Sequence, residues 1–374
     1  MNKTDKKIAS FYSLDVEILS APNQEIKDHL TRMVLGTPGQ LQYRFLEVSE
    51  KLSFLTNCRF LILKKLGRVI GSVCLIRRES PYAPGDYSFW YIRYMFIRAP
   101  LKPKTYKGKK KSRENALQLN FVWNSVLKYV EQPEIMVDES IRVKRSLLYS
   151  YVQRTNPSAF NFNIQVNLLP VRTLRTYFFS RTKPEQNRFV RQIREEEKDQ
   201  IIKYLREFYK DHIFYTEQNL FYKDQYYVYS KDNEIVAGLQ ANPEAWEFLY
   251  KPGLLGFILR KIVPVIPLIS KYWKPGNFRF TAIEGVFYKD SHEDKLIDLL
   301  ESVCAIHNNH FIFYWIDPES KIFRTITKPG VQGFMSRFFP SEEICLCAKF
   351  INWKKEEIDS FVSRPAYISC FDST

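Results

Sequence analysis

The sequence has 374 residues, of which 45% are hydrophobic and 16% aromatic. This composition excludes a disordered chain, and the length suits two domains that each bury a core. The formal net charge of +15 predicts an acidic partner, for which nucleic acid, anionic lipid, a phosphate-bearing cofactor and an acidic carrier protein all qualify.

The sequence has no recognisable targeting signal and no metal-ligand spacing. Met1–Ser10 is polar, without the apolar core of a signal peptide, and no apolar run has the length of a membrane span. We therefore expect a cytoplasmic protein. Peripheral attachment to the inner face of the membrane is compatible with this expectation. The six cysteines have neither paired metal spacing nor a disulfide framework, so they are expected to be small buried residues.

Alternating and helical patterns divide the first half of the chain into strands and helices. The predicted elements are a strand at Ser13–Ser20, helices at Gln24–Val34 and Gln40–Leu55, strands at Arg59–Lys65, Val69–Arg77 and Tyr87–Arg98, a helix ending at Val130, a strand at Leu147–Gln153, a helix at Ser158–Leu169 and a strand at Val171–Ser180. The turn sequence Leu66-Gly67-Arg68 joins two of these strands in a hairpin.

A strongly basic loop lies between the strand Tyr87–Arg98 and the long helix. Lys102–Arg113 contains seven cations and one glycine, and apolar residues then recur at helical spacing. Backbone amides, the positive end of a helix dipole and mobile lysines converge in such an arrangement, which is typical of an anion site. The candidate anion-binding residues are Lys107, Gly108, Lys109, Lys110, Lys111 and Arg113.

The second half repeats the order of the first after a polar linker at Thr182–Asn187. Its predicted elements are a helix at Glu195–Tyr209, a hairpin of Tyr226–Ser230 and Glu234–Gln240, a strand at Phe278–Tyr288, a helix at Glu293–His307, a strand at Phe311–Ile316, a broken helix at Lys321–Phe338 and a strand at Glu343–Phe350. This weak internal repeat predicts two domains, residues 1–182 and 188–374.

The order of hairpin, strand, phosphate loop and helix resembles the acyl-CoA-binding core of the GNAT N-acyltransferase superfamily. Tandem units of this kind resemble the Fem-type aminoacyltransferases and N-myristoyltransferase. The resemblance implies an α/β fold of two tandem GNAT-like units, each a mixed, mostly antiparallel twisted sheet flanked by helices. It also implies acyl-CoA, or an acidic acyl carrier protein, as the acyl donor, with no metal.

The two copies differ at the loop that would hold the donor. The first copy offers Lys104-Thr-Tyr-Lys-Gly108, with lysines where the family has its second glycine. The second copy offers Lys289-Asp-Ser-His-Glu-Asp294, whose acids satisfy the helix dipole themselves and repel phosphate. The donor is therefore expected in the first copy.

Acyl transfer to an amine needs a proton acceptor and a proton donor to the departing thiolate. Glu284 is the only carboxylate inside a predicted central strand, so we expect it to be the base, to form a salt bridge, for example with Arg93 or Arg279, or to be exposed at an edge. The acid candidates are Tyr149 and Tyr151 in the first copy and Tyr314 in the second.

An apolar segment, Tyr250–Pro275, is inserted in the second copy. The cations Arg260-Lys261 interrupt it and its prolines break a helix, so a membrane-spanning helix is not expected. The sequence leaves three alternatives open: a segment lying in a membrane interface, a cap over a pocket for an apolar chain, and a connection packed on the core.

The function predicted from these features is transfer of an acyl group, which the aromatic strands and the apolar insert suggest is long, from acyl-CoA or an acyl carrier protein to an amine. Two alternatives stay open. One is a Fem-like aminoacyl transfer from tRNA, which the positive charge suits, although nucleic acid is the less expected partner. The other is a non-catalytic protein of this fold that binds a lipid or a protein, which the missing glycines favour.

Overall fold

The computed structural model describes residues 5–36, 39, 41–82, 87–97, 109–137, 145–250, 253–262, 265–266, 270, 272–337 and 341–373. The first half contains β1 (Lys6–Phe11), β2 (Leu14–Leu19), α1 (Gln24–Thr31), β3 (Gln42–Phe45), α2 (Val48–Phe54), β4 (Cys58–Lys65), β5 (Arg68–Arg78), β6 (Tyr87–Ile97), α3 (Lys109–Glu131), β7 (Arg145–Gln153), α4 (Pro157–Gln165) and β8 (Leu169–Ser180). The second half contains β9 (Val190–Gln192), α5 (Lys198–Tyr209), β10 (Tyr226–Lys231), β11 (Glu234–Tyr250), α6 (Gly253–Phe257), β12 (Phe278–Tyr288), α8 (Glu293–Ile306), β13 (Phe311–Ile316), α9 (Lys321–Ile326), β14 (Glu343–Ile351), α10 (Lys355–Val362) and α11 (Cys370–Ser373).

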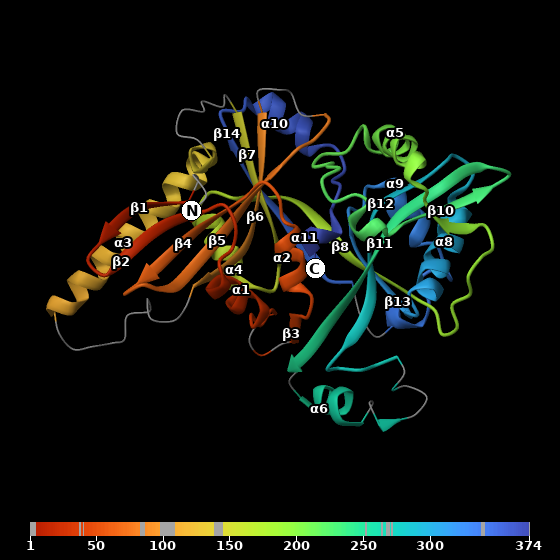
Figure 1. Cartoon of the computed structure of the whole chain (residues 1–374), viewed down its shortest axis with the longest axis horizontal. Helices are drawn as coiled ribbons and strands as arrows, with labels where there is room; N and C mark the ends of the chain where they lie inside the picture. Colours follow the sequence, from red (N-terminus) through yellow and green to blue (C-terminus); the bar gives the residue numbers. More distant parts are fainter. Residues whose placement is uncertain are drawn as a thin grey trace.

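One mixed sheet of 14 strands runs through the whole molecule (Figure 1). Its order is β1-β2-β4-β5-β6-β7-β14-β8-β13-β12-β11-β10-β9, and β3 pairs with β11 outside this path. The pairs β6–β7 and β12–β13 are parallel, and the other described pairs are antiparallel. This α/β architecture confirms the predicted fold class.

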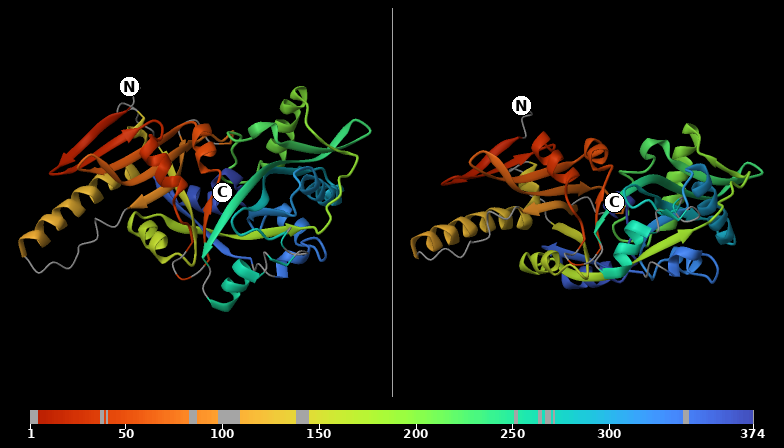
Figure 2. Two further views of the ribbon diagram at one scale, coloured as in Figure 1. Left: turned by 60° about the horizontal axis from the view of Figure 1, so that its bottom comes forward. Right: turned by 90° about the horizontal axis from the view of Figure 1, so that it is seen from below.

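Alternating side chains in the first half of the sheet fill two separate cores. On β4, Phe60 and Ile62 pack with α1, α2 and α10, whereas Leu61 and Leu63 pack with α3 and α4 on the opposite face. The views in Figure 2 show α3 running along the outer part of the red and orange strands. Helices therefore cover both faces of this half, as the alternation requires.

The predicted internal repeat is present in the order of the elements. The series β4-β5-β6-α3-β7-α4-β8 returns as β10-β11-β12-α8-β13-α9-β14. The last strand of each series lies beside the other half, because β14 pairs with β7 and β8 pairs with β13. The boundary at residues 182–188 stays a prediction, and the exchanged strands give the two halves a shared sheet.

Some sequence predictions were wrong in detail. The helix predicted for Gln40–Leu55 is instead β3 followed by α2, since Gln42–Phe45 pairs with the end of β11. Lys6–Phe11 forms an additional edge strand, β1. The broken helix predicted for Lys321–Phe338 is α9 and a short 3-10 turn at Phe334–Arg337. The six cysteines are all buried and free, as predicted.

A buried ion pair joins the two halves. Lys51 of α2 contacts Glu244 of β11 with Nζ 2.6 Å from the carboxylate, and their side chains are only 5% and 4% exposed. Burial and the nearby Glu244 raise the pKa of Glu47, at the start of α2, to about 7. The ammonium group of Lys51 therefore lies where it compensates negative charge inside the protein.

Lys51→Met is expected to lower the free energy of unfolding by about 3–5 kcal/mol, because it leaves Glu244 buried without its charged partner. Urea unfolding at neutral pH measures this loss. In the matched double variant Lys51→Met/Glu244→Leu both charges are gone, so most of the lost stability should return. A single variant as stable as the natural chain would contradict this account of the junction.

Candidate functional site

The parallel strands β6 and β7 separate halfway along their length. Their register runs from Tyr87, opposite Arg145, to Tyr91, opposite Tyr149, and then ends. At the same level the register of β5 with β6 shifts, and Tyr94 has a positive φ of 51°. This β-bulge turns β6 away from β7 and opens the sheet.

A cavity of about 260 Å³ occupies this opening. Residues from both faces of the sheet line it, including Tyr43 of β3 on the α2 side and Phe162 of α4 on the opposite side. The edges of the opening are formed by Tyr91–Met95 of β6 and Ser150–Gln153 of β7. The cavity therefore extends through the opened sheet and is lined from both of its faces.

The C-terminal segment places a carboxylate in the wall of this cavity. Asp372 of α11 lines the cavity and forms an ion pair with Arg78 of β5, and both side chains are buried. Its backbone carbonyl accepts a hydrogen bond from the Tyr91 hydroxyl at 3.0 Å. Burial raises the pKa of Asp372, while the Arg78 guanidinium opposes that shift. A carboxylate held this way is suited to accepting a proton.

Sequence reasoning missed Asp372. The available signal was the run Ala366–Phe371, which is mostly apolar, follows Pro365 and ends on an acid. Figure 1 shows the C-terminus between the two halves, next to α11, which contacts β12 and β13. The apolar run predicts a buried segment, but burial of the acid that follows it depends on a charged partner, which the run does not reveal.

The predicted tyrosines lie in different environments. Tyr151 lines the cavity, and its ring centroid is 5.5 Å from that of Tyr91. Tyr149 is buried and stacks on Tyr91, with ring centroids 5.2 Å apart. Tyr314 is buried in the core of the second half. Burial raises the pKa of all three hydroxyls, and only Tyr151 lines the central cavity.

In the second half, the equivalent strands β12 and β13 separate in the same way, but the protein itself occupies the space between them. The parallel register of β12 with β13 covers only Thr281 and Ala282, and Gly285 has a positive φ of 54° at the equivalent bulge. A Cβ atom at Gly285 would meet a methyl group of Leu220 at 2.7 Å. The Tyr226 hydroxyl donates to the Gly285 carbonyl oxygen at 2.6 Å. The chain itself therefore fills this second opening.

Glu284 lies next to the closed opening and is 1% exposed. One carboxylate oxygen accepts hydrogen bonds from the Ser369 hydroxyl and from the backbone amide of Cys370, and the other oxygen is buried without a partner. These contacts replace the predicted pairing with Arg93 or Arg279. Burial is the main reason that the pKa of Glu284 is raised to about 7. Glu284 lines none of the described cavities, and its role as a base stays a prediction.

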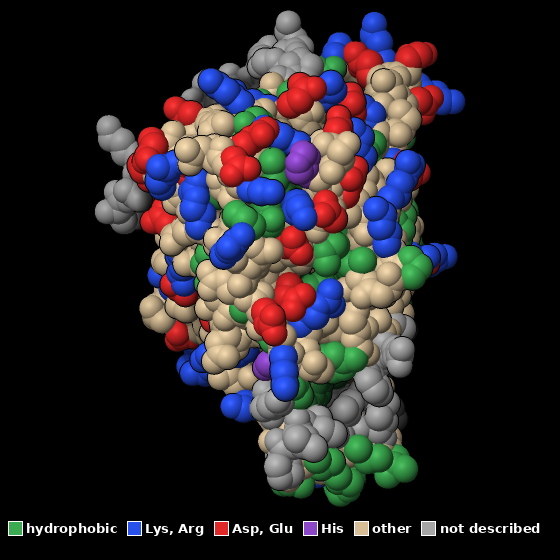
Figure 3. Space-filling model, turned by 90° about the vertical axis from the view of Figure 1, so that its right-hand side faces the viewer, with side chains coloured by type: hydrophobic (Ala, Val, Ile, Leu, Met, Phe, Trp, Pro, Cys, Tyr) green, Lys and Arg blue, Asp and Glu red, His purple; other side chains and the backbone are tan. Residues whose placement is uncertain are grey.

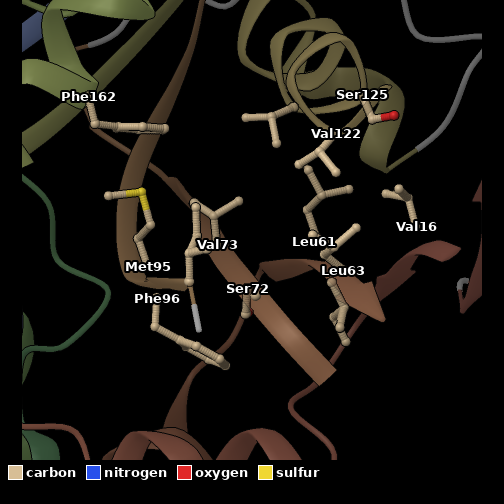
Figure 4. A pocket seen from close by; sticks show the side chains of 14 residues that line it. Val16, Leu61, Leu63, Ser72, Val73, Met95, Phe96, Val122, Ser125 and Phe162 are labelled. Carbon is tan, nitrogen blue, oxygen red and sulfur yellow. The ribbon is translucent and has the colours of Figure 1, made fainter. Parts of the chain in front are cut away.

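A smaller apolar cavity lies between the sheet and α3 (Figure 4). Its volume is about 50 Å³, and Leu61 and Val73 of the sheet face Val122 of α3 across it. Met95 and Phe162 line both this cavity and the central one. The flexible Met95 side chain therefore stands between an apolar pocket and the site beside Asp372.

The predicted anion-binding residues fall at the start of α3. Lys107 and Gly108 lie outside the described residues. Lys109, Lys110, Lys111 and Arg113 form the first turns of α3, where only the backbone is described. Across the described part of the chain, no group of three or more His, Cys, Asp or Glu side chains has the arrangement of a metal site.

The protein is similar to known proteins in its structure and not in its sequence. No family model matches the sequence, and no curated protein matches it. A crystal structure of Saccharomyces cerevisiae N-myristoyltransferase with bound myristoyl-CoA matches with a TM-score of 0.56 at 11% identity, over 93% of this chain and 85% of that chain. A structure of the same enzyme with myristoyl-CoA and inhibitors matches with a TM-score of 0.56 at 10% identity, over 94% and 82%. The chain therefore has the tandem GNAT fold that is seen in N-myristoyltransferase.

Proposed function

We propose that the protein is an N-acyltransferase that moves an acyl group from an acyl-CoA thioester to an amine. The observation that carries this proposal is the cavity at the separation of β6 and β7, which is lined from both faces of the sheet and has the buried Asp372 in its wall. The similarity in fold to an enzyme solved with bound myristoyl-CoA supports acyl-CoA as the donor.

The donor enters from the α3 side in this proposal. The basic start of α3 attracts the phosphates of the donor, and the pantetheine arm follows the gap between β6 and β7. The bulge at Tyr94 and Met95 interrupts the register with β5, so backbone amides at this point are suited to donating to the thioester carbonyl oxygen.

The acceptor amine enters from the opposite face, past Tyr43 and Phe45. Its nitrogen attacks the thioester carbonyl carbon, a C–N bond forms and the C–S bond breaks. Asp372 accepts the proton that the amine loses, and Tyr151 donates a proton to the departing thiolate of CoA. Asp372 then releases its proton to solvent and the Tyr151 hydroxyl takes one up, so the enzyme returns to its starting state.

The acyl chain extends past Met95 into the apolar cavity beneath α3. This cavity is lined almost entirely by apolar side chains, and movement of Met95 and Phe162 would join it to the central cavity. A chain of many carbons would then bury its methylene groups between the sheet and α3. Long-chain donors are accordingly the proposed substrates.

Thermal unfolding with CoA, acetyl-CoA and palmitoyl-CoA tests the donor. A thioester present at about 100 times its dissociation constant should stabilise the fold by about 2.7 kcal/mol. Val122→Trp fills the apolar cavity, so it is expected to abolish the extra stabilisation by palmitoyl-CoA and to preserve the response to CoA. Leu117→Trp, at an exposed position of the same helix, is the matched control.

A second variant, Lys109→Glu/Lys110→Glu, examines the phosphate end of the same donor. This variant should weaken the binding of CoA, acetyl-CoA and palmitoyl-CoA alike, because all three carry the CoA phosphates. No stabilisation by any thioester would reject the proposed function and would favour the non-catalytic alternative. Release of the CoA thiol with a panel of primary amines, including peptides with a free amino terminus, then tests for transfer.

A further inference from the structure

The insert between β11 and β12 projects from the body of the protein. β11 is 17 residues long and carries α6 on its far end, away from the central sheet (Figure 1). Large apolar side chains of this insert are exposed: Leu254 by 75%, Phe257 by 57% and Val265 by 74%. Ile262 and Ile266 are exposed as well. Hydrophobic side chains gather at the lower end of the molecule in Figure 3.

The base of the insert is firmly attached, in contrast to its tip. Trp273 is buried and stacks on Phe248 with ring centroids 4.9 Å apart. The Phe248 amide donates to the Pro275 carbonyl oxygen at 2.7 Å, and the Tyr272 hydroxyl donates to Thr182. Tyr272 and Trp273 therefore hold the insert on the protein, whereas the exposed apolar residues lie at its outer end.

The charge of the insert indicates what its apolar tip contacts. Residues 250–275 contain five cations, Lys251, Arg260, Lys261, Lys271 and Lys274, and no Asp or Glu. Lys261 is exposed among the apolar residues of the tip. An apolar segment whose charged residues are all cations is complementary to a surface that is apolar inside and negative outside. An anionic membrane has this structure, and a typical protein surface carries both signs of charge.

We propose that the tip of the insert, Leu254, Phe257, Ile262, Val265 and Ile266, docks the protein on the surface of an anionic membrane. The apolar side chains enter the interface between headgroups and acyl chains, and Lys261 stays at the headgroups. Among the described helices, none has the length and apolar character to cross a membrane, so the contact is peripheral. The proposal does not depend on the proposed enzymatic function.

Docking would also orient the central cavity. The end of β11 pairs with β3, where Phe248 lies opposite Tyr43 and Tyr250 opposite Gln42. Tyr43 and Phe45 of β3 line the acceptor side of the central cavity. A membrane bound at the tip therefore lies nearer to the proposed acceptor entrance than to the basic start of α3. If the proposed function holds, acceptors at the membrane surface would reach the site without leaving the membrane.

Flotation of the purified protein with vesicles tests this docking. Vesicles of phosphatidylcholine with phosphatidylserine are expected to bind the protein, and vesicles of phosphatidylcholine alone to bind it at least about ten-fold more weakly. Leu254→Glu/Phe257→Glu should reduce binding to the anionic vesicles by about ten-fold or more, and Lys261→Glu should reduce it by less. Leu66→Glu is the matched control, since Leu66 is 80% exposed at the turn between β4 and β5.

Each outcome decides the proposal. Loss of binding in the double variant, with binding kept in Leu66→Glu and an unchanged melting temperature in both, supports it. Absence of vesicle binding, or equal binding by all variants, overturns it. Dimers in solution that dissociate in the double variant would also overturn it, because a second copy of the chain would then cover the tip. Thermal unfolding with acyl-CoA tests the donor site separately.

Discussion

Asp372→Asn is expected to lower the rate of acyl transfer by about 10²–10⁴, because it removes the proposed proton acceptor while preserving the shape of the side chain. Binding of the acyl-CoA should remain. In the natural chain the rate should rise with pH through the raised pKa of Asp372, since only the ionised carboxylate accepts a proton. The asparagine variant should lose this dependence. The measurement is release of the CoA thiol as a function of pH.

The variant also breaks a buried ion pair with Arg78, so a loss of activity needs a structural control. Asp317→Asn provides it, because Asp317 is a buried carboxylate paired with Arg172 away from the central cavity. Both substitutions are expected to cost stability, about 3–5 kcal/mol if the remaining guanidinium finds no other partner. Only Asp372→Asn should change the pH profile. Equal activity of the two variants would exclude Asp372 as the base.

Glu284→Gln is expected to stabilise the protein above neutral pH. The pKa of Glu284 is about 7 in the folded chain and 4.5 for an ordinary glutamate, so the folded state binds more protons between these values. The stability of the natural chain therefore falls as pH rises from about 4.5 to 7. The difference between the two pKa values corresponds to a loss of about 3 kcal/mol in the free energy of unfolding at pH 8. Glutamine avoids this loss, and its amide oxygen can still accept from Ser369 and Cys370.

Urea unfolding of both proteins at pH 4 and pH 8 measures the effect. The two should have nearly equal stability at pH 4, where both side chains are neutral, and the variant should be the more stable at pH 8. Activity of the same variant tests the prediction that Glu284 is a base: a variant that is more stable and fully active would assign Glu284 a structural role.

Local patterns in the sequence determined most of the strands and their tandem order. The hairpin of β4 and β5 follows from alternating apolar residues on both sides of Gly67, and the hairpin of β10 and β11 from the turn at Lys231–Asn233. Both signals lie within a few residues of the structure that they specify. The same local order was sufficient to suggest the tandem fold that the structural comparison then supported.

Only the tertiary structure decided which strand completes each half and which carboxylate lies in the central cavity. β14 pairs with β7 across about two hundred residues of sequence, and β3 forms because β11 offers it an edge. Asp372 reaches Arg78 and Tyr91 because the apolar C-terminal segment is buried between the halves. Such long-range contacts leave no periodic pattern in the sequence, since their free energy comes from burial and pairing that exist only after the chain has folded.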